Sequence, residues 1–166
     1  GDLLAVDIGG ATTDVYSMAS GEPTVDNTML KGLPEPWMKR TVEGDLGMRY
    51  SLTHVYEQIP GSDNPENEYM QQVKAWVELC TARPDTLAAP GSEEEKLEEF
   101  LGRSAVSMAV ERHCGRIADV YTPLGLMHTQ EGKDLMNVPS VIGIGGVLRN
   151  SRRPEEILKG SLYDFM

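Results

Sequence analysis

The chain has 166 residues, a length that fits one domain, and its 40% hydrophobic and 25% charged residues are typical of a globular protein. Acidic residues outnumber basic ones by 26 to 15, and the net charge of −11 argues against nucleic acid or an anionic membrane as the main partner. The two cysteines, Cys80 and Cys114, form no CxxC pair, so they predict neither a disulfide framework nor a zinc site and favour a reducing, cytoplasmic location.

The predicted elements, taken in chain order, are strands, then helices, then strands again. The first strand is a short continuous apolar run of the kind that is buried on both faces, and the second is rich in β-branched and aromatic residues. The longest helix follows Ser92, which can cap it, and the acidic residues 93–95 are expected to be solvated at its positive N-terminus. Strands are predicted at residues 3–8, 13–18, 24–30, 117–121, 126–129 and 138–146; helices are predicted at residues 43–59, 69–80 and 92–114 and from residue 154. Residues 122–137 are expected to be irregular or a hairpin.

Some histidine and tryptophan residues could be mistaken for ligand-binding groups. His113 stands beside Cys114, but neighbouring positions on a helix point in different directions, so a packed helix end is favoured over a metal-binding pair. Trp37 and Trp76 are expected to be packing anchors rather than stacking platforms.

The turn between the first two strands lies in the stretch DIGGATTD, residues 7–14. Its small residues let backbone amides approach a ligand, its threonine hydroxyls add donors, and consecutive amides in such a turn form an anion-binding concavity. Asp7 would repel a phosphate unless a divalent cation lay between them, held by water and the phosphates, as Mg²⁺ usually is. The alternative is an ordinary hairpin turn in which Thr and Asp make only local hydrogen bonds. If the turn binds phosphate, the binding residues are Gly9, Gly10, Ala11, Thr12 and Thr13.

A second glycine site lies in SVIGIGGVLRN, residues 140–150, where a buried strand runs into Gly145 and Gly146. Glycines at a strand end allow a planar ring or a ribose to lie against the backbone. Other phosphate motifs fit worse. EGKD has Asp134 where a Walker A loop needs Ser or Thr, and GIGGVL has Leu148 where a Rossmann fingerprint needs its third glycine.

These stretches resemble three motifs of the actin, sugar kinase and Hsp70 ATPase superfamily, in the superfamily's order. DIGGATTD resembles the second phosphate motif, VEGDLGMR (residues 42–49) the start of a helix that lines the nucleotide cleft, and IGIGGVLR (residues 142–149) the adenosine motif. The resemblance implies that the hairpin turn binds the β- and γ-phosphates and that Gly145, Gly146 and Arg149 border the nucleoside. For Glu43 two interpretations stay open, a cleft residue or a charge pair with Asp45 at a helix N-terminus.

Within that superfamily, DLLAVDIGGATTDVYS, PEPWMKRTVEGDLGMRYS and VIGIGGVLRN resemble the MutL-type glutamate mutase accessory proteins. These proteins are encoded with adenosylcobalamin-dependent mutases and are unrelated to the mismatch-repair protein of similar name. The resemblance implies an ATP-binding, ATPase-like protein that services or reactivates the mutase.

We therefore expect residues 1–166 to form one α/β domain, the second, ribonuclease H-like lobe of an actin-like ATPase domain. It would have a mixed sheet with flanking helices and a small helical insertion at about residues 60–114. The first lobe is expected to lie outside this chain, so that the fragment alone would be inactive.

The ligands expected from the resemblance are ATP or ADP with Mg²⁺. Asp7 would be the catalytic carboxylate and would hold Mg²⁺ through water, and Asp14 would assist the metal or hold the turn. The other expected partners are the first lobe and an adenosylcobalamin-dependent mutase, whereas no apolar run approaches the ~20 residues of a membrane span. Two alternatives are a small-molecule kinase of the same superfamily and a non-catalytic scaffold or assembly module that retains the fold.

Overall fold

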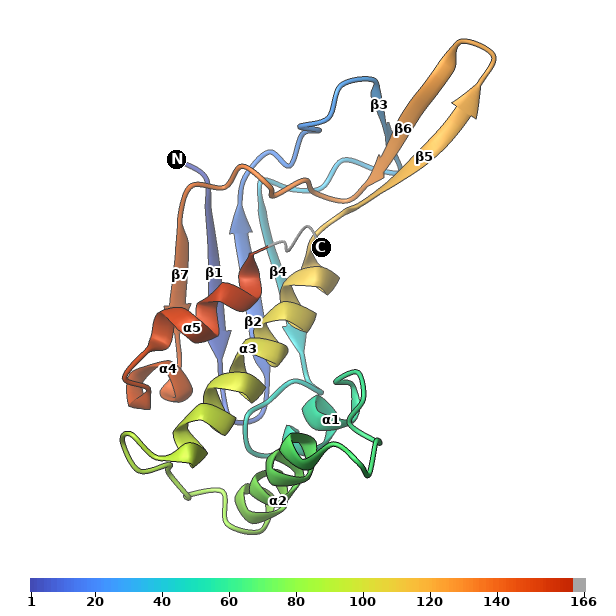
Figure 1. Cartoon of the computed structure of the whole chain (residues 1–166). Coiled ribbons are helices and arrows are strands. Elements are labelled where there is room, and N and C mark those ends of the chain that lie inside the picture. The colour runs from blue at the N-terminus through green and yellow to red at the C-terminus, as the bar shows by residue number, and fades with distance from the viewer. Residues whose placement is uncertain (163–166) are drawn as a thin grey trace.

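The computed structural model describes residues 1–162 and contains two β-sheets, the larger of which is covered on one face by helices (Figure 1). The larger sheet, sheet A, has the order β4-β2-β1-β7. Its strands are β1 (Leu3–Ile8), β2 (Thr13–Met18), β4 (Met38–Glu43) and β7 (Val141–Ile144). β2 runs antiparallel to β1 and to β4, whereas β7 runs parallel to β1. The expected α/β class with a mixed sheet and flanking helices is confirmed.

The smaller sheet, sheet B, projects from the body of the molecule (Figure 1). It has the order β3-β6-β5 and consists of β3 (Thr28–Lys31), β5 (Arg116–Thr122) and β6 (Gly125–Glu131). β5 and β6 are antiparallel and joined by a tight turn. Residues 122–137, expected to be irregular or a hairpin, supply the turn and the second strand of this hairpin, whose first strand lies before them, and β6 extends further than the sequence pattern indicates.

The longest helix, α3, packs on sheet A, so the helical segment expected at about residues 60–114 contributes a layer of the core. Leu101, Ala105 and Ala109 of α3 are buried, as are Val6 and Val15 of the two central strands. Ser92 caps α3 as predicted, because its side chain accepts a hydrogen bond from the amide of Glu95 at 3.2 Å. The helices are α1 (Leu52–Glu57), α2 (Glu68–Ala82), α3 (Glu93–His113), α4 (Gly146–Asn150), α5 (Pro154–Leu158) and the 3-10 turn η1 (Lys159–Ser161).

His113, the last residue of α3, is fully buried and forms a packed helix end, as predicted. Its two ring nitrogens form hydrogen bonds with the hydroxyls of Ser17 and Thr41, each at 2.8 Å. Burial, aided by the positive charges of Lys39 and Lys133, lowers the pKa of His113 to about 4. The imidazole is therefore neutral near pH 7.

Two expectations about side-chain environment are wrong. Glu95 is not solvated: it is 5% exposed, and its carboxylate accepts hydrogen bonds from the amide of Gly91 and from Arg152. These partners offset the cost of burying the charge. Trp76 is buried as expected, but Trp37 is 48% exposed.

The helix predicted over residues 43–59 is wrong in its first half. β4 occupies residues up to Glu43, and the helix begins only at Leu52. Between them the backbone turns to bond the β1–β2 hairpin, since the amides of Met48 and Arg49 donate to the hairpin carbonyls. Tertiary hydrogen bonds therefore override a nearly helical spacing of apolar residues.

No helix among residues 1–162 is long and apolar enough to cross a membrane.

Candidate functional site

The β1–β2 hairpin turn contains several backbone amides that have no acceptor within residues 1–162. The amide of Gly9 closes the turn by donating to the carbonyl of Thr12 at 2.9 Å. Within residues 1–162, the amides of Gly10, Ala11 and Thr12 donate to no protein acceptor. Gly10 and Ala11 are exposed. Amides without a protein acceptor are free to donate hydrogen bonds to an anion.

The carbonyls of the same turn are held by the segment that follows β4. The amide of Met48 donates to the carbonyl of Gly9, and the amides of Arg49 and Tyr50 both donate to the carbonyl of Gly10, each at 2.9 Å. Gly47 lies against Ala11 so closely that a Cβ would overlap the Ala11 carbonyl group. The turn is thus fixed through its carbonyls, which leaves its amides for a ligand.

The second glycine site adjoins the first through β7. Gly145 has a φ of 122°, and a Cβ at this position would overlap the carbonyl oxygen of Ile8 at the end of β1. Glycine is required here both for the backbone conformation and for the close approach. The parallel pairing of β7 with β1 therefore brings Gly145 and Gly146 beside the hairpin turn.

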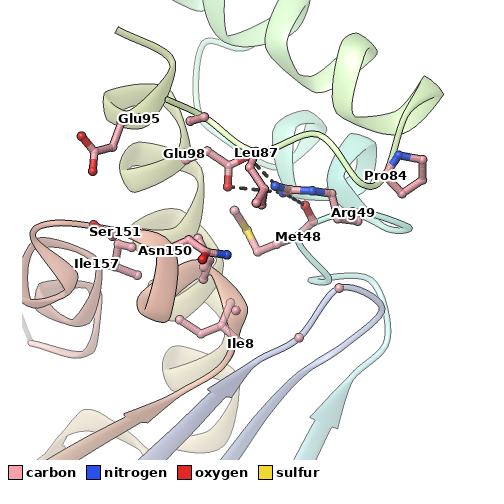
Figure 2. A pocket seen from close by; sticks show the side chains of 15 residues that line it. Ile8, Met48, Arg49, Pro84, Leu87, Glu95, Glu98, Asn150, Ser151 and Ile157 are labelled. Carbon is pink, nitrogen blue, oxygen red and sulfur yellow. Dashed lines mark hydrogen bonds and ion pairs between the residues drawn. The ribbon is translucent and has the colours of Figure 1, made fainter. Parts of the chain in front are cut away.

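Both glycine sites border one pocket of about 220 Å³ (Figure 2). Its volume is below the ~300–1,000 Å³ usual for pockets that enclose a whole small molecule. Gly9 and Gly10 of the first site and Gly146 of the second line this pocket together. The remaining lining residues are Ile8, Met48, Arg49, Pro84, Leu87, Ala88, Glu95, Glu98, Val147, Asn150, Ser151 and Ile157.

Arg49 and Glu98 form a charged pair in the wall of this pocket (Figure 2). Their side chains are 14% and 10% exposed, and Arg49 Nη1 lies 3.0 Å from Glu98 Oε1. Trp76 Nε1 donates to the same carboxylate oxygen at 2.8 Å. Sequence analysis missed both charged residues, because only the folded chain brings α3 to the segment after β4.

Asp7 and Asp14 lie on a different face of sheet A from the pocket. They are paired across β1 and β2, on the face opposite to Ile8 and Val15. Arg40 Nη2 lies 2.7 Å from Asp14 Oδ2, and the Thr12 hydroxyl donates to Asp14 Oδ1 at 3.0 Å. Burial alone would raise the pKa of Asp14, but these partners outweigh it and hold the pKa below its ordinary value.

The carboxylate of Asp7 is half-buried and, within residues 1–162, takes part in no hydrogen bond or ion pair. In the same part of the chain, no group of three or more His, Cys, Asp or Glu side chains could hold a metal ion. A cation beside Asp7 would therefore depend on water and on a ligand's own oxygens, which is the usual situation of Mg²⁺ at phosphates.

Three other predicted site residues are engaged elsewhere or lie outside the pocket. The Thr13 hydroxyl is buried and donates to the carbonyl of Leu46 at 2.7 Å. Glu43, at the end of β4, pairs with Arg112 at 2.7 Å. Arg149 is exposed on α4 and does not line the pocket.

The fold and the site define an α/β protein in which two glycine turns, far apart in sequence, border one pocket at the end of a mixed sheet. The sequence profile of the MutL protein family matches residues 1–165, and the chain belongs to this family. It is 48% identical over 167 aligned positions to Protein MutL of Clostridium tetanomorphum. The match covers 99% of this chain but only 36% of that relative, so the chain spans about a third of the relative's length.

Proposed function

We propose that this chain binds a nucleotide, ATP or ADP, within a MutL-family protein that serves an adenosylcobalamin-dependent glutamate mutase. The observation that carries the proposal is the turn of residues 9–12: three of its amides have no acceptor within residues 1–162, and Gly9 and Gly10 line a pocket that also contains Gly146. The amides of Gly10, Ala11 and Thr12 would bind phosphate, and the pocket would receive part of the nucleoside. Membership of the MutL family supports the link to the mutase.

In this proposal the residues at the turn have separate tasks. The hydroxyl of Thr13 is already donated to Leu46, so Thr13 positions the turn rather than binding phosphate. Asp14 is held by Arg40 and likewise supports the turn. Asp7 is the carboxylate that would hold Mg²⁺ through water. When bound, the cation would offset phosphate charge and orient the γ-phosphate.

We further propose that hydrolysis, where it occurs, belongs to the longer protein. A turn that supplies amides to one side of a triphosphate leaves the other side in water. On the bound side, hydrogen bonds to the amides merely replace hydrogen bonds to water, so the net gain in binding free energy is small. Hydrolysis needs an attacking water held in line with the γ-phosphate by groups on both sides. The relative is much longer than this chain, and a second lobe within such a polypeptide would supply those groups.

A non-catalytic assembly module is the second candidate. It is favoured by the ion pair that occupies Asp14. It is also favoured by the position of Asp7, which does not line the pocket and lies on the face of β1 opposite to Ile8. Under this alternative the full-length protein would bind nucleotide without turning it over.

Substitution of Gly10 tests the proposal, because a Cβ at this position has no neighbour closer than 3.8 Å. Gly10→Glu would place a negative charge on the phosphate-binding turn, whereas Gly10→Ala is the matched control. Calorimetry with the full-length protein should give at least about a tenfold weaker affinity for ATP, ~1.4 kcal/mol, for Gly10→Glu and little change for Gly10→Ala. Equal affinity of Gly10→Glu and the parent would contradict a phosphate site here.

The link to the mutase needs its own experiment. Full-length protein should retain a cobalamin-dependent mutase on an affinity column, with a yield that depends on whether ATP, ADP or neither is present. Gly10→Glu should lose the nucleotide dependence. Retention of no cobalamin enzyme under any of the three conditions would count against the mutase as partner.

A further inference from the structure

Arg49 joins three separate parts of the pocket wall. Its backbone amide donates to the carbonyl of Gly10 at 2.9 Å, which anchors the hairpin turn. Its side chain donates to the carbonyl of Met48 at 2.6 Å and to the carbonyl of Thr86, between α2 and α3, at 2.9 Å. The same guanidinium pairs with Glu98 of α3. Arg49 therefore contacts the turn through its backbone amide, and the α2–α3 loop and α3 through its side chain.

These contacts hold the guanidinium in a single arrangement. Glu98 is itself fixed, because Trp76 Nε1 donates to it and Cys80 lies beside it. A planar guanidinium can serve two carbonyls and a carboxylate at once, whereas the point charge of a lysine cannot reproduce that fork. Loss of the fork would leave Glu98 as a buried charge without its partner, which is strongly unfavourable.

We propose that Arg49 is a positioning residue for nucleotide phosphates, an inference that rests on the proposed function. Met48 and Arg49 hold the carbonyls of Gly9 and Gly10, and the guanidinium fixes the Met48 carbonyl and the α2–α3 loop. Arg49 thereby sets the direction of the turn's amides. Its charge is already matched by Glu98, so it acts through the turn and not as a direct phosphate ligand.

A matched control lies on the neighbouring position of α3. Glu99 is buried like Glu98 and pairs with Arg153 at 2.6 Å. Neither Glu99 nor Arg153 lines the pocket or touches the hairpin turn. Arg153→Ala therefore breaks a second ion pair of the same helix, one whose arginine is more exposed than Arg49, without removing a contact of the phosphate-binding turn.

The test compares ATP, ADP and adenosine as probes of full-length parent, Arg49→Lys and Arg153→Ala by calorimetry. Arg49→Lys should weaken ATP and ADP binding about tenfold and leave adenosine binding within about twofold. The ratio of the affinity for either nucleotide to the affinity for adenosine should therefore fall. Arg153→Ala should leave that ratio unchanged. A loss of folding alone would lower all affinities together and would not move the ratio.

Each outcome has a separate meaning. If the parent binds none of the three probes, the proposed function fails. If the parent binds ATP and Arg49→Lys keeps the parent's ratio, the function stands and the positioning role of Arg49 is wrong. If Arg49→Lys does not fold, Glu98→Gln replaces it in the test. Glutamine retains an acceptor for Trp76 and removes the negative charge that pairs with the guanidinium. Glu98→Gln should lower the same ratio, and an unchanged ratio would overturn the inference.

Discussion

Asp7 and Asp14 lie directly opposite each other on β1 and β2, and of the two it is Asp14 that Arg40 neutralises. Side chains at directly opposed positions of antiparallel strands share a face and lie close, with Cβ atoms ~4.5–5.5 Å apart. Two carboxylates so placed would repel each other without a nearby cation. Arg40 supplies that cation for Asp14, which leaves Asp7 as the carboxylate that can serve a ligand.

The first prediction concerns Asp7. In the full-length protein, Asp7→Asn should lower ATP turnover by about tenfold or more and affect ATP binding much less, because a cation's charge matters most as charge shifts in the transition state. Removal of a charge opposite Asp14 should also stabilise the fold slightly, by ~0.5 kcal/mol. A phosphate-release assay and calorimetry measure the two effects. A variant as fast as the parent would show that Asp7 does not take part in catalysis.

The second prediction concerns the close approach of Gly145 to β1. Gly145→Ala would meet the carbonyl oxygen of Ile8 in a backbone conformation that alanine rarely adopts, so it should lower the free energy of unfolding by about 3 kcal/mol. Gly146→Ala is the control, since a Cβ there has no neighbour within 4 Å. Urea denaturation of both variants checks the difference. Equal stability would mean that β7 and β1 do not approach as described.

The third prediction is a pH dependence of stability from His113. Its pKa is about 4 in the fold and 6.5 ordinarily, so the unfolded chain binds a proton that the folded chain does not between these values. Stability should therefore be complete above about pH 6.5 and fall by up to about 3 kcal/mol as the pH is lowered to 4. Urea midpoints across this range should lose that slope in His113→Gln.

A control for this prediction is His54→Gln, because His54 is exposed and its side chain is 64% accessible. This variant should retain the slope between pH 6.5 and pH 4. If both variants keep the parent's slope, His113 is not the group responsible.

The fourth prediction concerns Glu43, which lies at the end of β4 and not at a helix N-terminus, so that only the cleft interpretation is left to test. Its carboxylate pairs with Arg112, which also binds Asp45, so Glu43→Gln should cost about 0.5 kcal/mol of stability and leave ATP affinity within about twofold. Asp45→Asn, which removes a carboxylate from the same arginine, should behave alike. If calorimetry shows a tenfold loss of ATP affinity for Glu43→Gln but not for Asp45→Asn, Glu43 contributes to nucleotide binding after all.

Local patterns predicted those parts of the fold whose contacts lie nearby in sequence. The apolar run of β1 predicted burial on both faces, whereas only Leu4, Val6 and Ile8 on one face are buried. The β-branched content of β2 and the cap at Ser92 depend on near neighbours in the sequence. The backbone conformation of residues 46–50 could not be predicted from its neighbours, because its hydrogen-bond partners are Gly9 and Gly10 in a hairpin distant in sequence. The burial of Glu95 likewise depends on Arg152, far along the chain.

The candidate site divides in the same way. Gly9, Gly10 and Gly146 could be predicted, because glycine at a strand end is a visible sign of close backbone approach. Arg49 and Glu98 could not, since an arginine in a loop and a glutamate on a helix have no periodicity or spacing that marks them as partners. The hydrogen bond from the Thr13 hydroxyl to the Leu46 carbonyl could not be predicted either, because it depends on how the turn after β4 folds against the hairpin.

The pairing of β7 with β1 also sets the order in which this protein can assemble. β1, β2 and β4 are close in the chain, so they can pair early during synthesis. The pairing of Leu4 with Val141 requires β7, which is synthesised much later. Pairings between such distant residues form late, since a long loop must close first. Until then one edge of β1 stays open to other strands, a hazard for a nascent chain. The pocket, which needs both glycine turns, can therefore form only after β7 has been synthesised and has paired with β1.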